Sequence, residues 1–179
     1  GNTGMPVNDV RAVKIDASGN TWTGYGNFGL SRFDGKNWNI YQPENSPMPD
    51  YDIRDIETDD KGNVWIATGY GLIMIPYVSL GGQNWTVYDT DNSGLASNSL
   101  RCLHYSNGNL WIGSTISLIR FDGSNWETFT EENSTLPGYD IRDMVTDPDS
   151  NLWIGTYGYG LIRISYESIF YELFWELYN

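Results

Sequence analysis

The stretch Asp59–Leu72 reads Asp-Asp-Lys-Gly-Asn-Val-Trp-Ile-Ala-Thr-Gly-Tyr-Gly-Leu, and the rest of the chain copies it. A close copy occupies Asp147–Leu161, where Asn-Leu-Trp-Ile-Gly-Thr again precedes a Gly-Leu pair. Looser copies occupy Asp16–Leu30 and Ser106–Leu118. The 179 residues are therefore four versions of one unit, and internal repetition of this kind indicates a repeat architecture.

The tryptophans measure the length of the repeat. One series follows the Asn-rich turns with spacings of 43, 46 and 42 residues, and a second series has spacings of 47, 41 and 49. A period of this length is typical of a four-stranded propeller blade. We expect these indoles to pack between blades, because each buries a large apolar area. The two series are Trp22, Trp65, Trp111 and Trp153, and Trp38, Trp85, Trp126 and Trp175.

The second copy shows how one unit divides into strands. Short runs rich in β-branched and aromatic residues alternate with turns of Asp, Gly and Asn, which predicts strands over Ile53–Thr58, Val64–Thr68, Leu72–Ile75 and Trp85–Tyr88. The chain is thus predicted to be all-β, a single propeller domain of four four-stranded blades. The approximate blade boundaries are 2–44, 45–91, 92–132 and 133–179.

A pair of blades is the larger repeating unit. Asn45–Asp55 returns 88 residues later as Asn133–Asp143, which favours an even number of blades. Two closures fit: a four-bladed ring, or a homodimer in which two chains form an eight-bladed ring, and we favour the second. The C-terminal Ser165–Tyr178 has an amphipathic helical appearance, but its alignment to the second copy favours a strand over its last residues.

Composition excludes several classes of protein. A net charge of −13 argues against nucleic acid as a partner, and no apolar run reaches the ~20 residues of a membrane span. No secretion signal is recognisable. The single Cys102 and single His104 do not provide a metal site or a catalytic triad, and no phosphate-binding loop is present. We therefore expect no catalytic residue, metal or cofactor.

The segment Ile53–Leu72, with Ile-Arg-Asp-Ile, Gly-Asn, Val-Trp-Ile-Ala-Thr and Gly-Leu, resembles the two-component regulator propeller repeat. Ile141–Leu161 carries the same elements. The resemblance implies a β-propeller of the kind found in periplasmic sensor portions of hybrid histidine kinases, where it is implicated in detecting glycan fragments. It implies a periplasmic or cell-surface location. Propellers of the family usually have about seven repeats, whereas this chain has four and no kinase.

Four arginines share one position, the start of the first strand of each unit. Because that strand is innermost in a propeller, Arg11, Arg54, Arg101 and Arg142 are predicted to surround one mouth of the central channel. Neighbouring Asp residues accompany all but Arg101. Two interpretations remain: an Arg–Asp lattice that ties the blades together, or a ring that binds an anionic ligand such as a uronate.

Aromatic residues should gather at the same mouth. Aromatic side chains on loops held by a rigid scaffold are typical of a carbohydrate site, although a Tyr beside Gly also shields turn backbone. The candidates on the turns between second and third strands and on the loops that enter the blades are Tyr25, Phe28, Tyr51, Tyr70, Tyr139, Tyr157 and Tyr159.

These features favour a non-catalytic extracytoplasmic sensor module for a glycan-like or anionic ligand. A protein-interaction scaffold is the first alternative, and a propeller lyase or hydrolase is the second.

Overall fold

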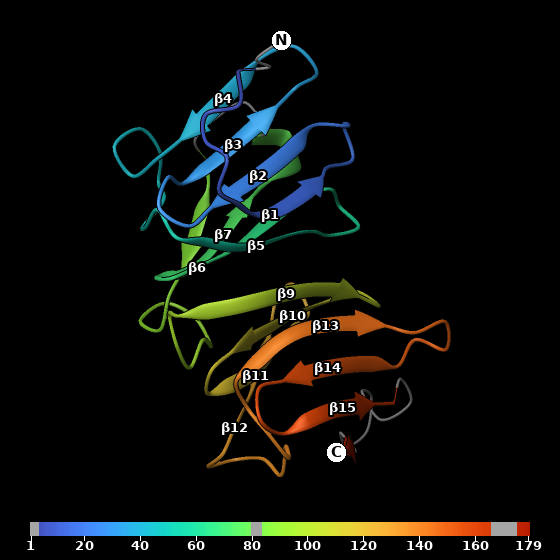
Figure 1. The fold of residues 1–179 in the computed structure, drawn as a ribbon. Helices are drawn as coiled ribbons and strands as arrows, with labels where there is room; N and C mark the ends of the chain where they lie inside the picture. The colour runs from blue at the N-terminus through green and yellow to red at the C-terminus, as the bar shows by residue number, and fades with distance from the viewer. Residues whose placement is uncertain (1–3, 80–83, 166–174) are drawn as a thin grey trace.

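The structure, a computed structural model, describes residues 4–79, 84–165 and 175–179. It contains four antiparallel sheets of four strands each, arranged in a row along the chain (Figure 1). The prediction of an all-β propeller with four-stranded blades is confirmed. The first two blades consist of β1 Val10–Ile15, β2 Thr21–Tyr25, β3 Leu30–Phe33 and β4 Trp38–Tyr41, and of β5 Ile53–Thr58, β6 Val64–Thr68, β7 Gly71–Ile75 and β8 Thr86–Tyr88. The last two consist of β9 Leu100–Ser106, β10 Asn109–Ser114, β11 Ser117–Phe121 and β12 Trp126–Thr130, and of β13 Ile141–Thr146, β14 Leu152–Thr156, β15 Gly160–Ile164 and β16 Trp175–Tyr178.

The strands follow one another across each sheet in sequence order. The first strands β1, β5, β9 and β13 contact one another from blade to blade, so they are innermost, as expected. The strand predicted at the C-terminus is confirmed as β16. Residues 166–174, where a helix was the alternative, lie outside the described residues. A short 3-10 turn, Tyr77–Ser79, follows β7.

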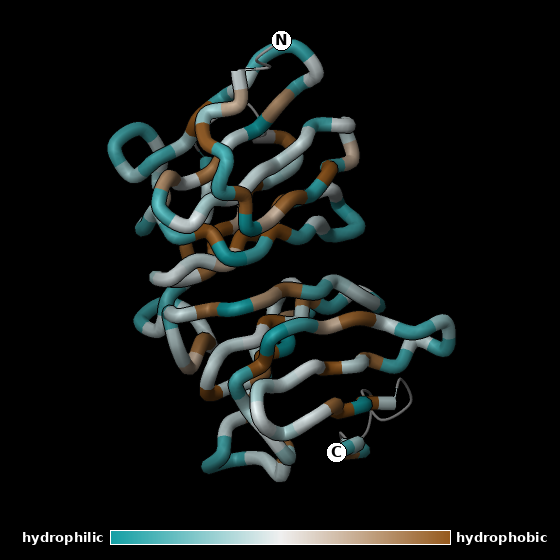
Figure 2. Tube along the Cα trace, in the orientation of Figure 1, coloured by the Kyte–Doolittle hydropathy of each residue, from teal (hydrophilic) through white to brown (hydrophobic). Residues whose placement is uncertain are grey.

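The hydrophobic core lies between the sheets, in three layers. The trailing face of a blade is the side that meets the next blade, and its leading face is the side that meets the blade before it. Each layer joins the trailing face of one blade to the leading face of the next. Ala12 and Trp22 of the first blade pack with Ile53 and Ile66 of the second, and the two later junctions repeat this arrangement. Figure 2 shows the apolar segments on the strands and mainly polar loops between them. Burial between blades therefore holds the arc together.

Each junction seats a branched side chain against a small residue. A Cβ built on Gly24 would collide with Ile53, and one built on Gly113 would lie 2.6 Å from Ile141 Cγ2. Ala67 takes the same position in the second blade and shares a cluster with Leu100. The small residue of each second strand is thus a socket for the first residue of the next blade.

The Asp-rich turns are fixed by an indole. Asp16, Asp59 and Asp147 each accept a hydrogen bond from the Nε1–H of the Trp six residues later, at 2.8, 2.9 and 2.8 Å. The same carboxylates also accept backbone N–H groups of the turn, for example that of Asn63. In the third blade Ser106 begins the turn, and Trp111 Nε1 is buried with no partner among the described residues. Turn structure explains these aspartates.

The row of blades is open at its ends. Val13 is 63% exposed, whereas its counterparts Ile56, Leu103 and Met144 are 3 to 5% exposed. At the other end Gly155 stands at the socket position, and a Cβ there would meet only the Asp143 carbonyl oxygen, at 3.8 Å. Figure 1 shows the first and last blades at opposite ends of the row.

Acid should weaken the fold through the turn carboxylates. Hydrogen bonds from Trp153 and Asn151 lower the pKa of Asp147 to about 2, below the ~3.9 of an unfolded chain. The ionised carboxylate thus contributes stability that is complete above about pH 4 and is lost as the pH falls toward 2. We expect Asp147→Asn to lower the unfolding temperature at pH 7, with the difference from wild type shrinking between pH 4 and pH 2. Asp149→Asn, in the same turn, is the control, and an equal loss there would contradict the assignment.

The socket contact predicts that replacing glycine by alanine affects stability at one socket and not at another. Gly113→Ala should lower the free energy of unfolding by ~1–3 kcal/mol, because the added methyl group overpacks against Ile141 and Cys102. Gly155→Ala places its methyl group in open space and should cost nothing measurable. Urea denaturation of the two variants tests this, and equal destabilisation would show that the socket contact is unimportant.

Candidate ligand site between the third and fourth blades

The loops that connect consecutive blades, here called interblade loops, are held at one end of the propeller by backbone hydrogen bonds. Before β13, the Asp140 N–H donates to Thr115 O in the β10–β11 turn, and the Tyr157 N–H donates to Asp140 O, both at 3.0 Å. Asp140 has φ 55°, a left-handed conformation that Asp tolerates better than most residues. The loop is thus placed between the turns of two blades.

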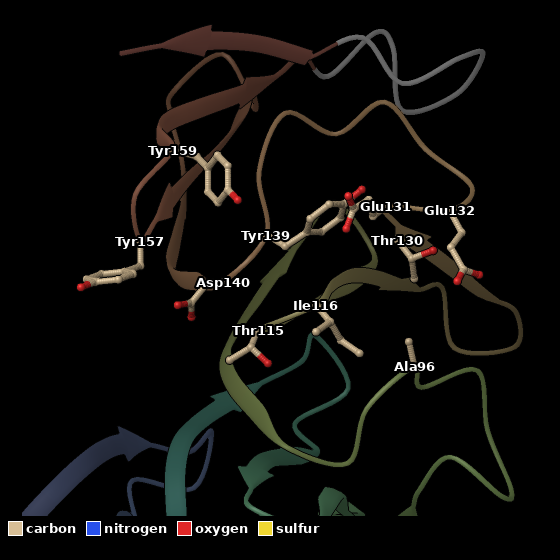
Figure 3. A pocket seen from close by; sticks show the side chains of 10 residues that line it. All are labelled: Ala96, Thr115, Ile116, Thr130, Glu131, Glu132, Tyr139, Asp140, Tyr157 and Tyr159. Carbon is tan, nitrogen blue, oxygen red and sulfur yellow. The ribbon is translucent and has the colours of Figure 1, made fainter.

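A cavity of about 650 Å³ lies over this arrangement. Figure 3 shows its aromatic wall, in which Tyr159 from the β14–β15 turn and Tyr139 from the interblade loop point toward the space above Ile116 of the third blade, while the Tyr157 ring points away from it. Tyr157 is 70% exposed, and the ring face that Arg142 does not cover is open for stacking. The remaining lining residues are Ala96, Thr115, Thr130, Glu131, Glu132 and Asp140.

The charge of this cavity is negative. Glu131, Glu132 and Asp140 line it, and its lining contains no basic side chain. Arg142 is held by Asp140 at 2.8 Å and lies over the Tyr157 ring, 5.0 Å from its centroid. A carboxylate ligand would therefore meet repulsion here, whereas hydroxyl groups can donate to the carboxylates. The acidic walls come from a Glu-Glu pair after β12 that the sequence interpretation did not single out.

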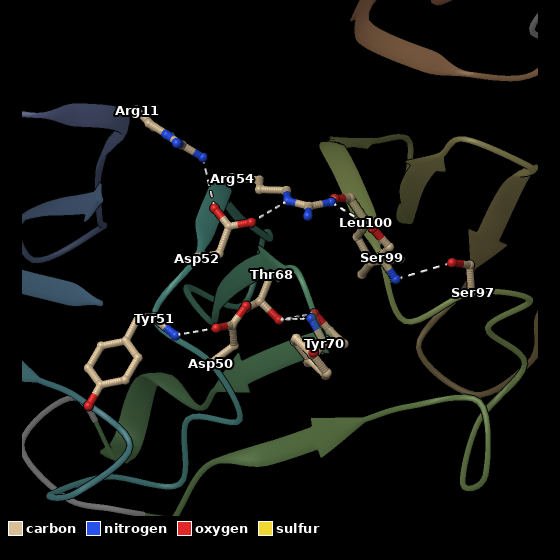
Figure 4. A network of polar contacts seen from close by, with 11 residues as sticks. Arg11, Asp50, Tyr51, Asp52, Arg54, Thr68, Tyr70, Ser97, Ser99 and Leu100 are labelled. Carbon is tan, nitrogen blue, oxygen red and sulfur yellow. Dashed lines mark hydrogen bonds and ion pairs between the residues drawn. The ribbon is translucent and has the colours of Figure 1, made fainter. Parts of the chain in front are cut away.

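The arginines at the channel mouth form a lattice with aspartates. Asp52 accepts from Arg11 Nη1 at 2.8 Å and from Arg54 Nε at 2.9 Å (Figure 4). Arg54 Nη1 continues to the third blade, where it donates to Ser99 Oγ and Leu100 O, each at 2.8 Å. This chain of bonds crosses two junctions, so it favours the structural interpretation of these two arginines.

Arg101 differs from the other three. It makes no ion pair among the described residues, and its Nε is buried without a hydrogen-bond partner there. The carboxylate at the equivalent of Asp52 is Asp140, whose Oδ1 is also buried and unpartnered within the same part of the chain. The blade 3–4 junction thus lacks the crossing Arg–Asp pair that Arg11 and Asp52 form, and a donor and an acceptor remain without a partner among the described residues of this junction.

The predicted aromatic platform is only partly assembled. Tyr139, Tyr157 and Tyr159 come together, but Tyr25 does not belong to a ligand surface. Tyr25 is 1% exposed, and its hydroxyl group hydrogen-bonds Ser31 Oγ at 2.9 Å. The prediction failed because Tyr25 is the last residue of β2, at the position of Thr68, and not part of the turn.

The remaining candidates lie elsewhere on the same end. Phe28 packs edge-on against Tyr25, with ring centroids 5.6 Å apart. The Tyr51 hydroxyl group donates to Glu44, which raises the pKa of the phenol and lowers that of the carboxyl group. Tyr70 is 66% exposed but does not line the cavity between the third and fourth blades.

The titratable groups of the inner strands have structural partners. Asp55 Oδ2 accepts the Leu103 N–H of the next blade at 2.7 Å, and burial raises its pKa to about 6. His104 Nε2 hydrogen-bonds Thr146 Oγ1 at 2.6 Å, and desolvation lowers its pKa. Within the described residues no three His, Cys, Asp or Glu side chains form a metal-binding group, and no helix there is long and apolar enough to cross a bilayer.

Comparison with known proteins matches residues 47–70 and 135–158 to the two-component regulator propeller family. Two segments of the chain thus match the repeat of this family. Both matched segments include an interblade loop and the first two strands of a blade, in the second and fourth blades. The resemblance expected from the sequence is therefore confirmed. A comparison with curated protein sequences gives no match.

Solved structures place the repeats in a wider group of propellers. The extracellular domain of a protein assigned as a hybrid two-component system of B. thetaiotaomicron superposes with a TM-score of 0.80 at 20% identity, over 94% of this chain and 23% of that one. A second such domain from the same organism gives 0.71 at 22% identity, over 93% and 25%. A catalytically inactive virginiamycin B lyase of Staphylococcus aureus gives 0.71 at 17% identity, over 98% and 57%. The chain thus spans about a quarter of the first two and little more than half of the lyase, and these likenesses show the fold.

The lattice predicts that two arginines at equivalent positions differ in importance. Arg54→Ala should lower the free energy of unfolding by ~1–3 kcal/mol, because it leaves part-buried partners on two blades unsatisfied. Arg142→Ala removes an exposed pair within one blade and should cost below ~1 kcal/mol. Urea denaturation of both variants measures the difference, and a larger loss for Arg142→Ala would refute the lattice.

Proposed function

We propose that this chain is a non-catalytic, extracytoplasmic ligand-binding module of a sensor, with a periplasmic or cell-surface location. The family match and the extracellular domains to which the fold is similar support this role. Those domains are extracellular parts of proteins assigned as hybrid two-component systems. The observation that carries the binding role is the aromatic cavity between the third and fourth blades.

The proposed ligand is a neutral glycan fragment. Tyr157 and Tyr159 offer faces for stacking against apolar sugar surfaces, and Glu131 and Glu132 offer acceptors for sugar hydroxyl groups. A hydroxyl group both donates and accepts, which suits the unused Asp140 Oδ1 and Arg101 Nε at this junction. An anionic ligand, the other possibility raised by the arginine positions, is less favoured because the cavity walls are acidic.

Binding measurements on defined glycans test the proposal. A glycan array should show neutral oligosaccharides binding in preference to uronate-containing ones. Calorimetry with the best hit should then show about tenfold weaker binding for Tyr157→Ala and for Tyr159→Ala, the factor that corresponds to ~1.4 kcal/mol of lost contact. Tyr70→Ala is the matched control, since it removes the exposed tyrosine of the equivalent turn in the second blade.

Three results would overturn the proposal. The first is the absence of any glycan hit, which would favour a protein-interaction scaffold on the same surface. The second is binding of uronates that depends on Arg101, tested with Arg101→Ala, which would move the site to the channel mouth. The third is chemical change of the glycan during prolonged incubation, which would show a lyase or hydrolase.

A further inference from the structure

The leading face of the first blade is exposed along its inner strand, although Thr23 and Ser31 of its middle strands are buried within the chain. Its exposed part is complementary to the trailing face of the fourth blade. Ten of the fourteen exposed large apolar side chains among the described residues lie in these two blades, and four lie in the middle two. Each contact type that recurs at the three internal junctions can be located on the two free faces. Equivalent positions then show whether a further junction of the same kind can form.

The socket contact is available. Ile53 fills the socket of Gly24 and Ile141 fills that of Gly113. On the free faces Val10 is the corresponding branched residue, and it is exposed. Gly155 is the corresponding socket, and among the described atoms only the Asp143 carbonyl oxygen of the same blade lies within 4 Å of its built Cβ, at 3.8 Å.

The polar contacts are also available. Arg11 crosses a junction to Asp52, and on the free faces the corresponding residues are Arg142, exposed on the fourth blade, and Asp9, exposed before β1. These two residues carry opposite charges, and Arg142 also pairs with Asp140 within its own blade. Asp55 accepts the Leu103 N–H across a junction. On the free faces Asp143, which is also exposed, is the equivalent acceptor, and the N–H of Val13 is the equivalent donor.

One polar position of the internal junctions is apolar at the free ends. Along the inner strands Lys14 pairs with Glu57, and His104 bonds Thr146. The pair equivalent to His104 and Thr146 is Val145 with Ile15, which are 59% and 65% exposed. Both of these positions are apolar, whereas Glu57 is equivalent to Val145 itself, so the Lys14–Glu57 pair has no apolar counterpart at the free ends.

The outer strands repeat an aromatic contact. Tyr41 meets Trp85, Tyr88 meets Trp126, and Phe129 meets Trp175, with ring centroids 5.1, 5.3 and 5.5 Å apart. The next members are Tyr178, which is exposed, and Trp38. The match between the two free faces thus extends from the inner to the outer strand.

We propose that the partner of these faces is a second copy of the chain. The leading face of the first blade in one copy packs on the trailing face of the fourth blade in the other, and two such junctions close an eight-bladed ring. The contact joins two different faces, so it either closes or continues as a filament. Eight blades lie within the range that propellers adopt.

This junction is less apolar than those within the chain. On the leading face Thr23 and Ser31 stand where the second blade has Ile66 and Ile73, and Tyr25 already bonds Ser31. The contacts are therefore concentrated along the inner strand and the outer edge. We expect a dimer that dissociates on dilution and not a permanent one.

Sedimentation velocity of the 179-residue chain tests the proposal. The wild type should change from the mass of one chain, 20.3 kDa, to twice that mass as its concentration rises through the micromolar range. Gly155→Val, which fills the socket, and Val13→Glu, which charges the leading face, should each remain monomeric with unchanged melting temperatures. Gly113→Val is the matched control for the socket, and it should lose stability.

Mixing the two monomeric variants makes the test specific to a head-to-tail contact. Gly155→Val keeps an intact leading face and Val13→Glu keeps an intact trailing face, so the mixture should regain dimers joined at one junction. Wild type that stays monomeric at roughly 100 µM would overturn the proposal, because the dissociation constant of the dimer would then exceed that concentration. So would a mass that grows without limit, dimers that survive either substitution, or a mixture that stays monomeric.

Discussion

The structure depends on a sheet that is apolar on both faces. The second blade presents Ile66 to the blade before it and Trp65 to the blade after it, and each is buried in a different layer of the core. Burying one such side chain stabilises by ~1.5–3 kcal/mol, but a single blade cannot bury both of its faces. Repetition is therefore required by the packing, and the small residue at each socket sets how closely consecutive sheets approach.

The same constraint explains which features the sequence predicts. Strand positions in the second blade followed from β-branched runs between Asp-Gly turns, and the structure has Ile53–Thr58 and Val64–Thr68 as predicted. These are local features that recur, so each copy supports the assignment of the others. The indole hydrogen bond of the turn, as in Trp65 with Asp59, depends on a side-chain direction that strand assignment does not give.

The candidate site was less predictable, because it depends on where strands end and which loops meet. Tyr25 and Tyr70 look alike in sequence, each being flanked by glycine, yet one closes a strand inside the core and the other lies on the surface. Predicting the cavity requires knowing how far apart the third and fourth blades lie, and the sequence of a single repeat does not contain that information. Its acidic walls, Glu131 and Glu132, come from a turn that recurs in the first three blades, but only the third copy has two consecutive glutamates there.

The arginines at the channel mouth occupy one repeat position, but they differ in whether an aspartate of the next blade binds them. Arg11 and Arg54 both bind Asp52, and Arg54 also binds Leu100 O of the third blade, so these residues link three blades in one polar lattice. At the next junction the equivalent lattice is incomplete, and the cavity that we propose as the ligand site lies there. A gap in a structural network leaves donors and acceptors for something else to satisfy, which is the physical reason to place recognition at this junction.

The cavity and the free trailing face also share a structural element. The β14–β15 turn carries Tyr157 and Tyr159, which line the cavity, and it adjoins the socket strand that ends at Thr156. At the internal junctions an interblade loop rests on the turn of the blade before it, as Asp140 does on Thr115. A second copy docked on the fourth blade would bring its residues 4–9 against the tyrosine turn. Ligand and partner would then act on the same few residues, and each would change the free energy of binding the other.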